Sequence, residues 1–194
     1  ALNKFAKTHA KRTTAGFHKQ MRAAVLDALE ENFISTDFTR KAIIGGRDKE
    51  KSKAMFLSYS EWKRLVNYTR ATSNSYDFII YLSAMTGLRF AEVLGLTVAD
   101  IDLKNKSLTV NKTWDYKYHT GFKAPKNSNS VRTIDIDTQT LRVIKKVIRE
   151  RKFKLLDQKI CINTDGKLPV SATINRYLEN LCDKLEIPQI SFHG

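Results

Sequence analysis

Arg89 and Glu92 are the two residues of this chain whose types and spacing most directly predict chemistry. They lie in the stretch TGLRFAEVLGL, residues 86–96, where a guanidinium precedes a carboxylate by three positions. Residues three apart on a helix share a face, so the carboxylate can orient the guanidinium. A guanidinium held in this way is suited to gripping a phosphate or a carboxylate through paired hydrogen bonds. The alternative is a purely structural ion pair that closes the turn, and the spacing leaves both interpretations open.

Two helices separated by a glycine turn must position these side chains. Apolar residues recur at helical spacing between Tyr76 and Met85, which predicts a buried helix. Gly87 follows this helix and is suited to the left-handed cap conformation. Phe90 then belongs to a second, short apolar helix, with Arg89 in its first turn. Because the positive end of a helix dipole disfavours a cation, we expect another group, such as an anionic ligand, to require the arginine there.

The charge of the chain indicates a polyanionic partner. Its 194 residues include 34 Lys and Arg against 20 Asp and Glu, a net charge of +14, in a composition that is 42% hydrophobic and can fold around a core. This excess favours nucleic acid over a membrane surface. A protein kept soluble by lysine would show the same balance. No stretch reaches the roughly 18 apolar residues of a membrane-spanning helix, and the basic start lacks the apolar core of a signal peptide, so we expect a cytoplasmic protein.

The two cysteines predict neither a disulfide nor a metal site. Cys161 and Cys182 lie in apolar surroundings, without CxxC spacing or a cluster of histidines. We interpret them as reduced core thiols and expect no structural zinc site.

The N-terminal part predicts one amphipathic helix and a linker. Thr13 or Thr14 is suited to capping a helix that has an apolar stripe on one side and basic residues on the other. This basic face could lie against a DNA backbone or simply face solvent. Over 39–56 the apolar pattern fades into Gly45-Gly46 and alternating charges, which predicts a flexible linker.

The second domain, 57–194, adds strands to its helices. Lys106–Trp114 and Val131–Ile136 alternate in the manner of strands, and the region between them is rich in lysine. We expect a basic hairpin with a long tip that reaches a nucleic-acid groove or backbone. Further helix starts are predicted at Ser58 or Ser60, at Asp137 or Thr138, and at Ser171.

Three motifs, in this order, resemble the signatures of the tyrosine recombinases, the phage-integrase family. Residues 86–96, with the Asp-Ile-Asp of 100–102, are similar to the first signature box of that family. The stretch PKNSNSVRTI, 125–134, is similar to its hairpin motif, with Asn127 where threonine is commoner. Residues 191–194, Ser-Phe-His-Gly, resemble the opening of its second box. Within the family, the motifs most resemble those of integrases from Gram-positive phages and conjugative transposons.

The resemblance implies a fold and a division into domains. The fold is mainly α with a small antiparallel β-sheet, an α+β class. Residues 1–38 resemble the last helices of a core-binding domain, 39–56 a linker, and 57–194 the first two-thirds of a catalytic domain. In this family the two domains clamp double-stranded DNA, and the active form is a tetramer on that DNA.

The resemblance also implies a reaction without metal or nucleotide. A tyrosine attacks the scissile phosphate, forms a 3′-phosphotyrosine and frees a 5′-hydroxyl. Arg89 would hold the non-bridging oxygens, Lys126 would protonate the leaving oxygen, and His193 would bind the phosphate or assist proton transfer. Glu92 would hold Arg89 in line. The basic residues expected to contact DNA are Lys11, Arg12, Lys19, Arg22, Lys123 and Arg132.

The nucleophilic tyrosine of the family would follow Gly194, and none of the tyrosines in the sequence matches its place. We therefore expect this polypeptide to be a fragment that binds DNA but does not cleave it. Two alternatives remain: a catalytically inactive DNA-binding regulator derived from a recombinase, and a type IB topoisomerase with related chemistry.

Overall fold

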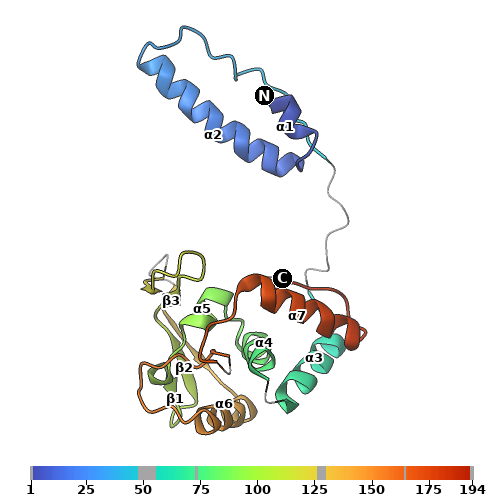
Figure 1. Ribbon diagram of the computed structural model, residues 1–194, viewed down its shortest axis with the longest axis vertical. Helices are drawn as coiled ribbons and strands as arrows, with labels where there is room; N and C mark the ends of the chain where they lie inside the picture. The colour runs from blue at the N-terminus through green and yellow to red at the C-terminus, as the bar shows by residue number, and fades with distance from the viewer. Residues whose placement is uncertain (1, 48–55, 73, 126–129, 164, 193–194) are drawn as a thin grey trace. The chain divides into compact units, whose positions relative to one another are not determined.

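The fold is described from a computed structural model that covers residues 2–47, 56–72, 74–125, 130–163 and 165–192. The chain divides into two compact units, 1–52 and 53–194, which are described separately. Helices predominate in both, and the second unit contains small antiparallel sheets (Figure 1). The predicted class, mainly α with a small antiparallel sheet, is confirmed.

The first unit is built on a long helix that starts earlier than predicted. It contains α1, Leu2–Ala6, and α2, Lys11–Glu30, and Ala10 rather than a threonine occupies the N-cap position of α2. The prediction of a Thr13 or Thr14 cap is therefore wrong. Thr14 is buried inside the helix, where its hydroxyl donates to the Ala10 carbonyl. The Lys11 amide donates instead to the Arg47 carbonyl, so a segment distant in sequence caps the helix.

Residues 39–47 pack along these helices, which differs from the predicted start of the linker. The Arg47 amide donates to the His9 carbonyl at 2.8 Å, and Thr39 is buried. A Cβ atom at Gly46 would lie 2.3 Å from the Lys11 backbone, so only glycine permits this close approach. The segment is therefore part of the first unit; most of the remaining predicted linker, 48–55, lies outside the described residues.

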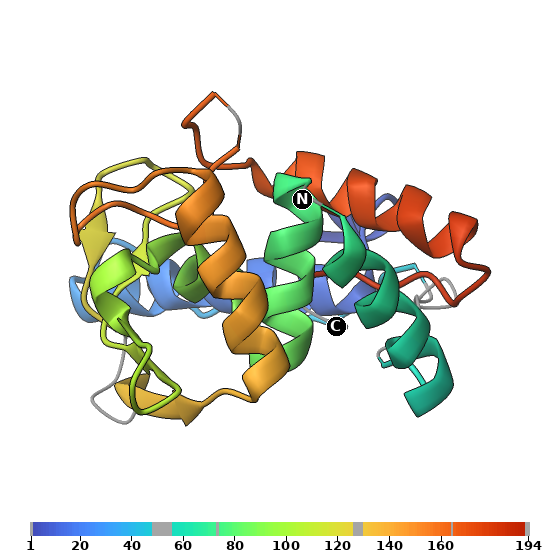
Figure 2. The same cartoon turned by 90° about the horizontal axis from the view of Figure 1, so that it is seen from below.

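The second unit is helical at its centre. Its helices are α3, Tyr59–Ala71; α4, Ser75–Thr86; α5, Phe90–Gly95; α6, Thr138–Glu150; and α7, Ser171–Lys184. Figures 1 and 2 show α4 lying between α3 and α6. Ile79, Tyr81 and Leu82 of α4 have no exposed surface. This helix forms the middle of the core. Because α4 is buried, it holds in place the turn that follows it, which carries Arg89.

Local capping signals set most of these helix starts as predicted. Ser58 and Glu61 form a capping box at α3, and the Asp137 carboxylate accepts from the first amides of α6. At α7 the prediction is one residue off, because Val170 takes the N-cap position and Ser171 is already helical.

Gly87 ends α4 as predicted, with φ +66° and ψ +20°, and its amide donates to the Ser83 carbonyl. Because a side chain disfavours this left-handed conformation, Gly87→Val is expected to lower the free energy of unfolding by about 1–2 kcal/mol. Denaturation followed by the fluorescence of Trp62 and Trp114, the two tryptophans of the chain, measures this loss. Gly87→Asn is the matched control and should lose less, because asparagine tolerates the left-handed region. Equal losses for both variants would contradict a conformational origin.

The main sheet supports the second motif. Its strands β1, Ile101–Asp102, β2, Ser107–Val110, and β5, Arg132–Asp135, follow the order β1-β2-β5 and are antiparallel. Leu108 of β2 pairs with Ile134 of β5. A short 3-10 helix, Val98–Asp100, precedes β1.

The predicted strand Lys106–Trp114 is broken in two. After β2 the chain forms a separate hairpin from β3, Thr113–Trp114, and β4, Phe122–Lys123. At the break, the Lys112 ammonium pairs with the buried Asp100 carboxylate. This ion pair turns Lys112 toward the 3-10 helix, an interaction that the alternation of residues along the strand does not reveal.

Cys161 and Cys182 are both buried thiols, as predicted. Burial raises the pKa of the Cys161 thiol to about 12, so it stays protonated and unreactive at neutral pH. Among the helices that the structure describes, none combines the length and the apolar character needed to cross a membrane.

Candidate active site

Arg89 lies at the entrance to α5, between the Gly87 turn and the buried Phe90. It is the N-cap residue of α5, with φ −70° and ψ 156°, and not a residue of the first helical turn as predicted. The turn is held from inside, because Leu88 is buried and its carbonyl accepts from the Ser83 hydroxyl at 2.8 Å. The Arg89 side chain points outward and is 72% exposed. Its guanidinium is thus accessible to a ligand, while its backbone is fixed.

Glu92 lies beneath Arg89, and its side chain is only 4% exposed. Its Oε2 accepts from the Arg89 backbone amide at 2.8 Å, and its Oε1 accepts from Arg89 Nη1 at 3.3 Å. Glu92 therefore contacts both the backbone amide and the guanidinium of Arg89, and its role in the reaction stays a prediction. A carboxylate at this helix start also satisfies a backbone donor that would otherwise lack a partner.

Arg132 of β5 approaches the same carboxylate from the sheet. Its Nη1 and Nη2 donate to Oε1 and Oε2 of Glu92, both at 3.0 Å, in a two-pronged arrangement. Arg132 Nη1 also donates to the Ser130 carbonyl at 3.3 Å. Residues of the first and second motifs, 40 positions apart in the chain, therefore meet at Glu92.

Electrostatics favour the charged forms of all three groups. Burial tends to raise the pKa of Glu92, but hydrogen bonds from Arg132 and Arg89 outweigh this and lower it below its ordinary value. The hydrogen bond to Glu92 raises the pKa of Arg132. Two guanidinium groups and one carboxylate carry a net charge of +1. The cluster Arg89, Glu92 and Arg132, here called the arginine cluster, can bind a phosphate at its exposed member, Arg89.

The pairing of Arg132 with Glu92 was not predicted from the sequence, although the sequence contains one signal for it. Arg132 and Ile134 have the same parity along β5, and the apolar side chains of an alternating strand, such as Ile134, face the core. Alternation therefore places Arg132 on the inner face of the strand, where an arginine requires a charged partner.

The hairpin holds the predicted DNA contact Lys123 against a buried carboxylate. Lys123 Nζ lies 2.7 Å from Asp115 Oδ2, and the Lys123 side chain is 51% exposed. Hydrogen bonds from Lys123 and Thr120 hold the pKa of Asp115 well below its usual range. Lys123 therefore anchors the hairpin. Lys126, the predicted general acid, lies outside the described residues.

The third motif reaches the first through two aromatic rings. Phe192 packs edge-on against Phe90, with ring centroids 5.1 Å apart, and the Phe192 amide donates to Asn175 Oδ1 at 2.9 Å. Phe90 directly follows Arg89 in the sequence, and Phe192 directly precedes the predicted phosphate ligand His193. His193 itself lies outside the described residues.

Some of the predicted DNA contacts of the first unit are exposed to solvent, and one is bound to other residues of the unit. Lys11, Arg12 and Lys19 are exposed on α2. Arg22 instead donates to Asp37 Oδ2 at 2.7 Å and to the Thr39 hydroxyl, so it stabilises the packing of the 39–47 segment.

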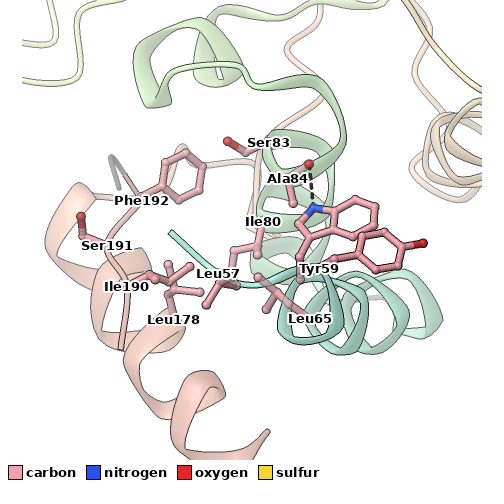
Figure 3. Close-up of a pocket in the computed structure, with 11 residues that line it drawn as sticks. Leu57, Tyr59, Leu65, Ile80, Ser83, Ala84, Leu178, Ile190, Ser191 and Phe192 are labelled. Carbon is pink, nitrogen blue, oxygen red and sulfur yellow. Dashed lines mark hydrogen bonds between the residues drawn. The ribbon is translucent and has the colours of Figure 1, made fainter. Parts of the chain in front are cut away.

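A separate apolar hollow of about 320 Å³ lies between α3, α4 and the segment after α7. Figure 3 shows Leu57, Ile80, Leu178 and Phe192 among its walls, with the Trp62 indole donating to the Ala84 carbonyl. No member of the arginine cluster lines it, and its described walls carry no charged side chain. It offers no group for phosphate chemistry. Within the described ranges, no group of three or more His, Cys, Asp and Glu residues could hold a metal ion.

Comparison with known proteins supports the family resemblance of the three motifs. The family model described as "Phage integrase family" matches residues 55–194. An integrase of Staphylococcus phage L54a is 30% identical over 161 residues, covering 72% of this chain and 46% of that protein. The transposase from transposon Tn916 of Enterococcus faecalis is 24% identical over 152 residues, covering 74% of this chain and 36% of its own. The chain thus spans less than half the length of these relatives.

Two solved structures show the same fold. The Tn1549 transposon integrase in complex with a circular intermediate DNA superimposes with a TM-score of 0.75 at 17% identity, covering 95% of this chain and 64% of that one. Lambda integrase, residues 75–356, bound to DNA gives a TM-score of 0.61 at 16% identity, covering 94% of this chain and 61% of the other.

Proposed function

Because the chain belongs to the phage integrase family of tyrosine recombinases, we propose that it binds duplex DNA and supplies the phosphate-holding part of a site-specific recombinase. The whole protein would cleave and rejoin DNA strands through a 3′-phosphotyrosine intermediate, in the bacterial cytoplasm and without a cofactor. Since the chain covers only part of its relatives, the activity concerns the whole protein.

One observation carries this proposal: the described residues of all three motifs converge on α5. Glu92 of the first motif binds Arg132 of the second, and Phe90 of the first contacts Phe192 of the third. Core packing brings distant segments together in any fold, but here the three motifs meet at one short helix. A single reaction centre requires it, because catalytic groups act only within hydrogen-bond reach of the same phosphate.

The proposed chemistry assigns one task to each group. Arg89 would bind the non-bridging oxygens of the scissile phosphate as negative charge builds on them. The tyrosine oxygen would form a bond to phosphorus while the bond from phosphorus to the 5′ oxygen breaks. Lys126 would donate the proton that the 5′ oxygen requires, and His193 would bind the phosphate or assist the proton transfer from the tyrosine. A 5′-hydroxyl of another strand would then attack the phosphorus of the 3′-phosphotyrosine, forming the new bond from phosphorus to the 5′ oxygen and releasing the tyrosine oxygen, which takes a proton.

The solved relatives support a DNA partner. The Tn1549 and lambda integrase structures contain DNA, and lambda integrase is described as a tetramer bound to a Holliday junction. We extend both properties to this protein as part of the proposal: duplex DNA as the ligand, and a tetramer of the whole protein on DNA.

DNA binding by this chain is expected to weaken steeply with salt. The affinity would come from counterions released by Lys and Arg, so the logarithm of the binding constant should fall by about 0.9 per phosphate contacted for each tenfold rise in salt. Fluorescence anisotropy with a labelled duplex between 50 and about 200 mM salt measures this slope. Arg142→Ala removes one exposed positive charge from α6 and keeps the arginine cluster intact, so it is the control for the loss of one charge alone. Binding that ignores salt, or no binding at low salt, would contradict the proposal.

Catalysis is tested with the whole protein and a nicked suicide substrate that traps the covalent intermediate. A covalent adduct between the protein and the 3′-phosphate end left by the cut supports the recombinase. DNA binding without any adduct would contradict the catalytic proposal and leave only a DNA-binding role.

A further inference from the structure

We propose that Arg132 is a positioning residue: it orients Arg89 through Glu92 and leaves the charge of Arg89 available to a phosphate, without contacting DNA itself. The inference rests on the proposed function for its ligand, a phosphate of duplex DNA. It replaces the expectation, drawn from charge alone, that Arg132 binds the DNA backbone.

Arg132 fixes the position of the Glu92 carboxylate. Its firmest side-chain bonds come from Arg132, at 3.0 Å to each oxygen, whereas its bond from the Arg89 guanidinium is longer, at 3.3 Å. Two parallel bonds fix the plane of the carboxylate. Arg132 therefore determines where the Glu92 oxygens lie, and these oxygens determine where the Arg89 guanidinium lies.

Arg132 also sets the net charge that the arginine cluster presents to a phosphate. Glu92 alone beside Arg89 would form a neutral pair with little attraction for a phosphate. With Arg132 bound, the arginine cluster carries a net charge of +1, and the compensated carboxylate repels an incoming phosphate less. Arg132 thus permits Glu92 to orient Arg89 without cancelling its charge.

The side chain of Arg132 is less available to contact DNA than that of Arg89. The side chain of Arg132 is 33% exposed and both terminal nitrogens donate to protein oxygens, whereas that of Arg89 is 72% exposed. The Ser130 carbonyl, which Arg132 also binds, lies four residues after Lys126 in the sequence. Arg132 is therefore connected to the first motif and to the end of the segment that carries the predicted general acid.

The first experiment measures Glu92 in the chain without DNA. Carbon-13 NMR of the Glu92 carboxyl gives its titration midpoint in the wild-type chain, in Arg132→Ala and in Arg132→Lys. Loss of a cation in direct contact is expected to raise this midpoint by roughly 1–3 pH units in Arg132→Ala, and by less in Arg132→Lys, which keeps the charge. An unchanged midpoint in Arg132→Ala would overturn the inference.

The second experiment is a double-mutant cycle on duplex affinity at one fixed salt concentration. Arg132→Ala is expected to weaken binding about tenfold when Glu92 is present, and less than about twofold in the Glu92→Gln background, because Arg132 acts through the carboxylate. An equal loss in both backgrounds would show a direct DNA contact and overturn the inference. Arg142→Ala serves as the control for the general loss of one positive charge.

The two experiments separate the failure of the inference from the failure of the proposed function. A wild-type chain that binds no DNA overturns the proposed function, while the Glu92 titration still decides whether Arg132 controls the carboxylate. Tryptophan fluorescence confirms that each variant is folded, and Arg132→Lys keeps the test valid if Arg132→Ala does not fold.

Discussion

Arg89→Ala is expected to slow DNA strand cleavage by the whole protein by roughly 10²–10³-fold. Arg89 is the exposed member of the arginine cluster, and its guanidinium would meet the non-bridging oxygens where charge develops. Removing such a preorganised donor costs far more in the transition state than in the bound substrate. Single-turnover cleavage of a suicide substrate, at saturating protein, measures this step separately from binding.

The matched control is Arg142→Ala, because Arg142 is also an exposed arginine but belongs to α6 and not to the arginine cluster. Its cleavage rate should stay within about twofold of the wild-type rate. Arg89→Lys should fall between the wild type and Arg89→Ala, since lysine keeps the charge but not the planar pair of donors. Equal rates for Arg89→Ala and the wild type would refute the assigned role.

Glu92→Ala is expected to lower the free energy of unfolding of the second unit by about 3–5 kcal/mol. The carboxylate is nearly inaccessible to solvent and accepts hydrogen bonds from the Arg89 amide and from both guanidinium groups. Without it, Arg132 is left partly buried with no counter-charge, and the Arg89 backbone amide at the start of α5 loses its acceptor. Urea denaturation followed by tryptophan fluorescence measures the change, because Trp62 and Trp114 both belong to this unit.

The charge contribution is isolated by comparing the wild type with Glu92→Gln at several pH values. The pKa of Glu92 is below its ordinary value of 4.5 in the folded state, so its charge stabilises the fold fully above pH 4.5. As the pH falls through the folded-state pKa, this stabilisation is lost and the two proteins should converge. A stability difference that is the same at pH 7 and at pH 3 would show that the carboxylate charge is not its source.

Much of the local structure could be predicted because its causes are local. The left-handed turn at Gly87, the capping box at Ser58 and the Asp137 cap each depend on residues within one helical turn. The predictions that failed depend on contacts from elsewhere. The Arg47 carbonyl caps α2 in place of a threonine, and the Lys112–Asp100 ion pair divides the predicted strand.

The candidate site shows the same division. The three-residue spacing of Arg89 and Glu92 indicated that they share a face, and the structure shows their contact. The role of Arg89 as a phosphate ligand came from motif resemblance and stays a prediction. The roles of Lys126 and His193 came from motif resemblance and stay predictions. Arg132 was recognised as basic and relevant, but charge alone suggested DNA as its partner rather than Glu92.

The sequence by itself determined the family, through three short motifs, and the helix ends around Arg89, which depend on residues within one helical turn. It indicated Arg89 as the group that would bind phosphate, and that role stays a prediction. Only the tertiary structure decided that Arg132 pairs with Glu92 and that Phe192 packs on Phe90. The physical reason is that spacing along one helix or strand specifies which residues share a face. Which distant face lies opposite depends on how the core around α4 packs the helices and the sheet together.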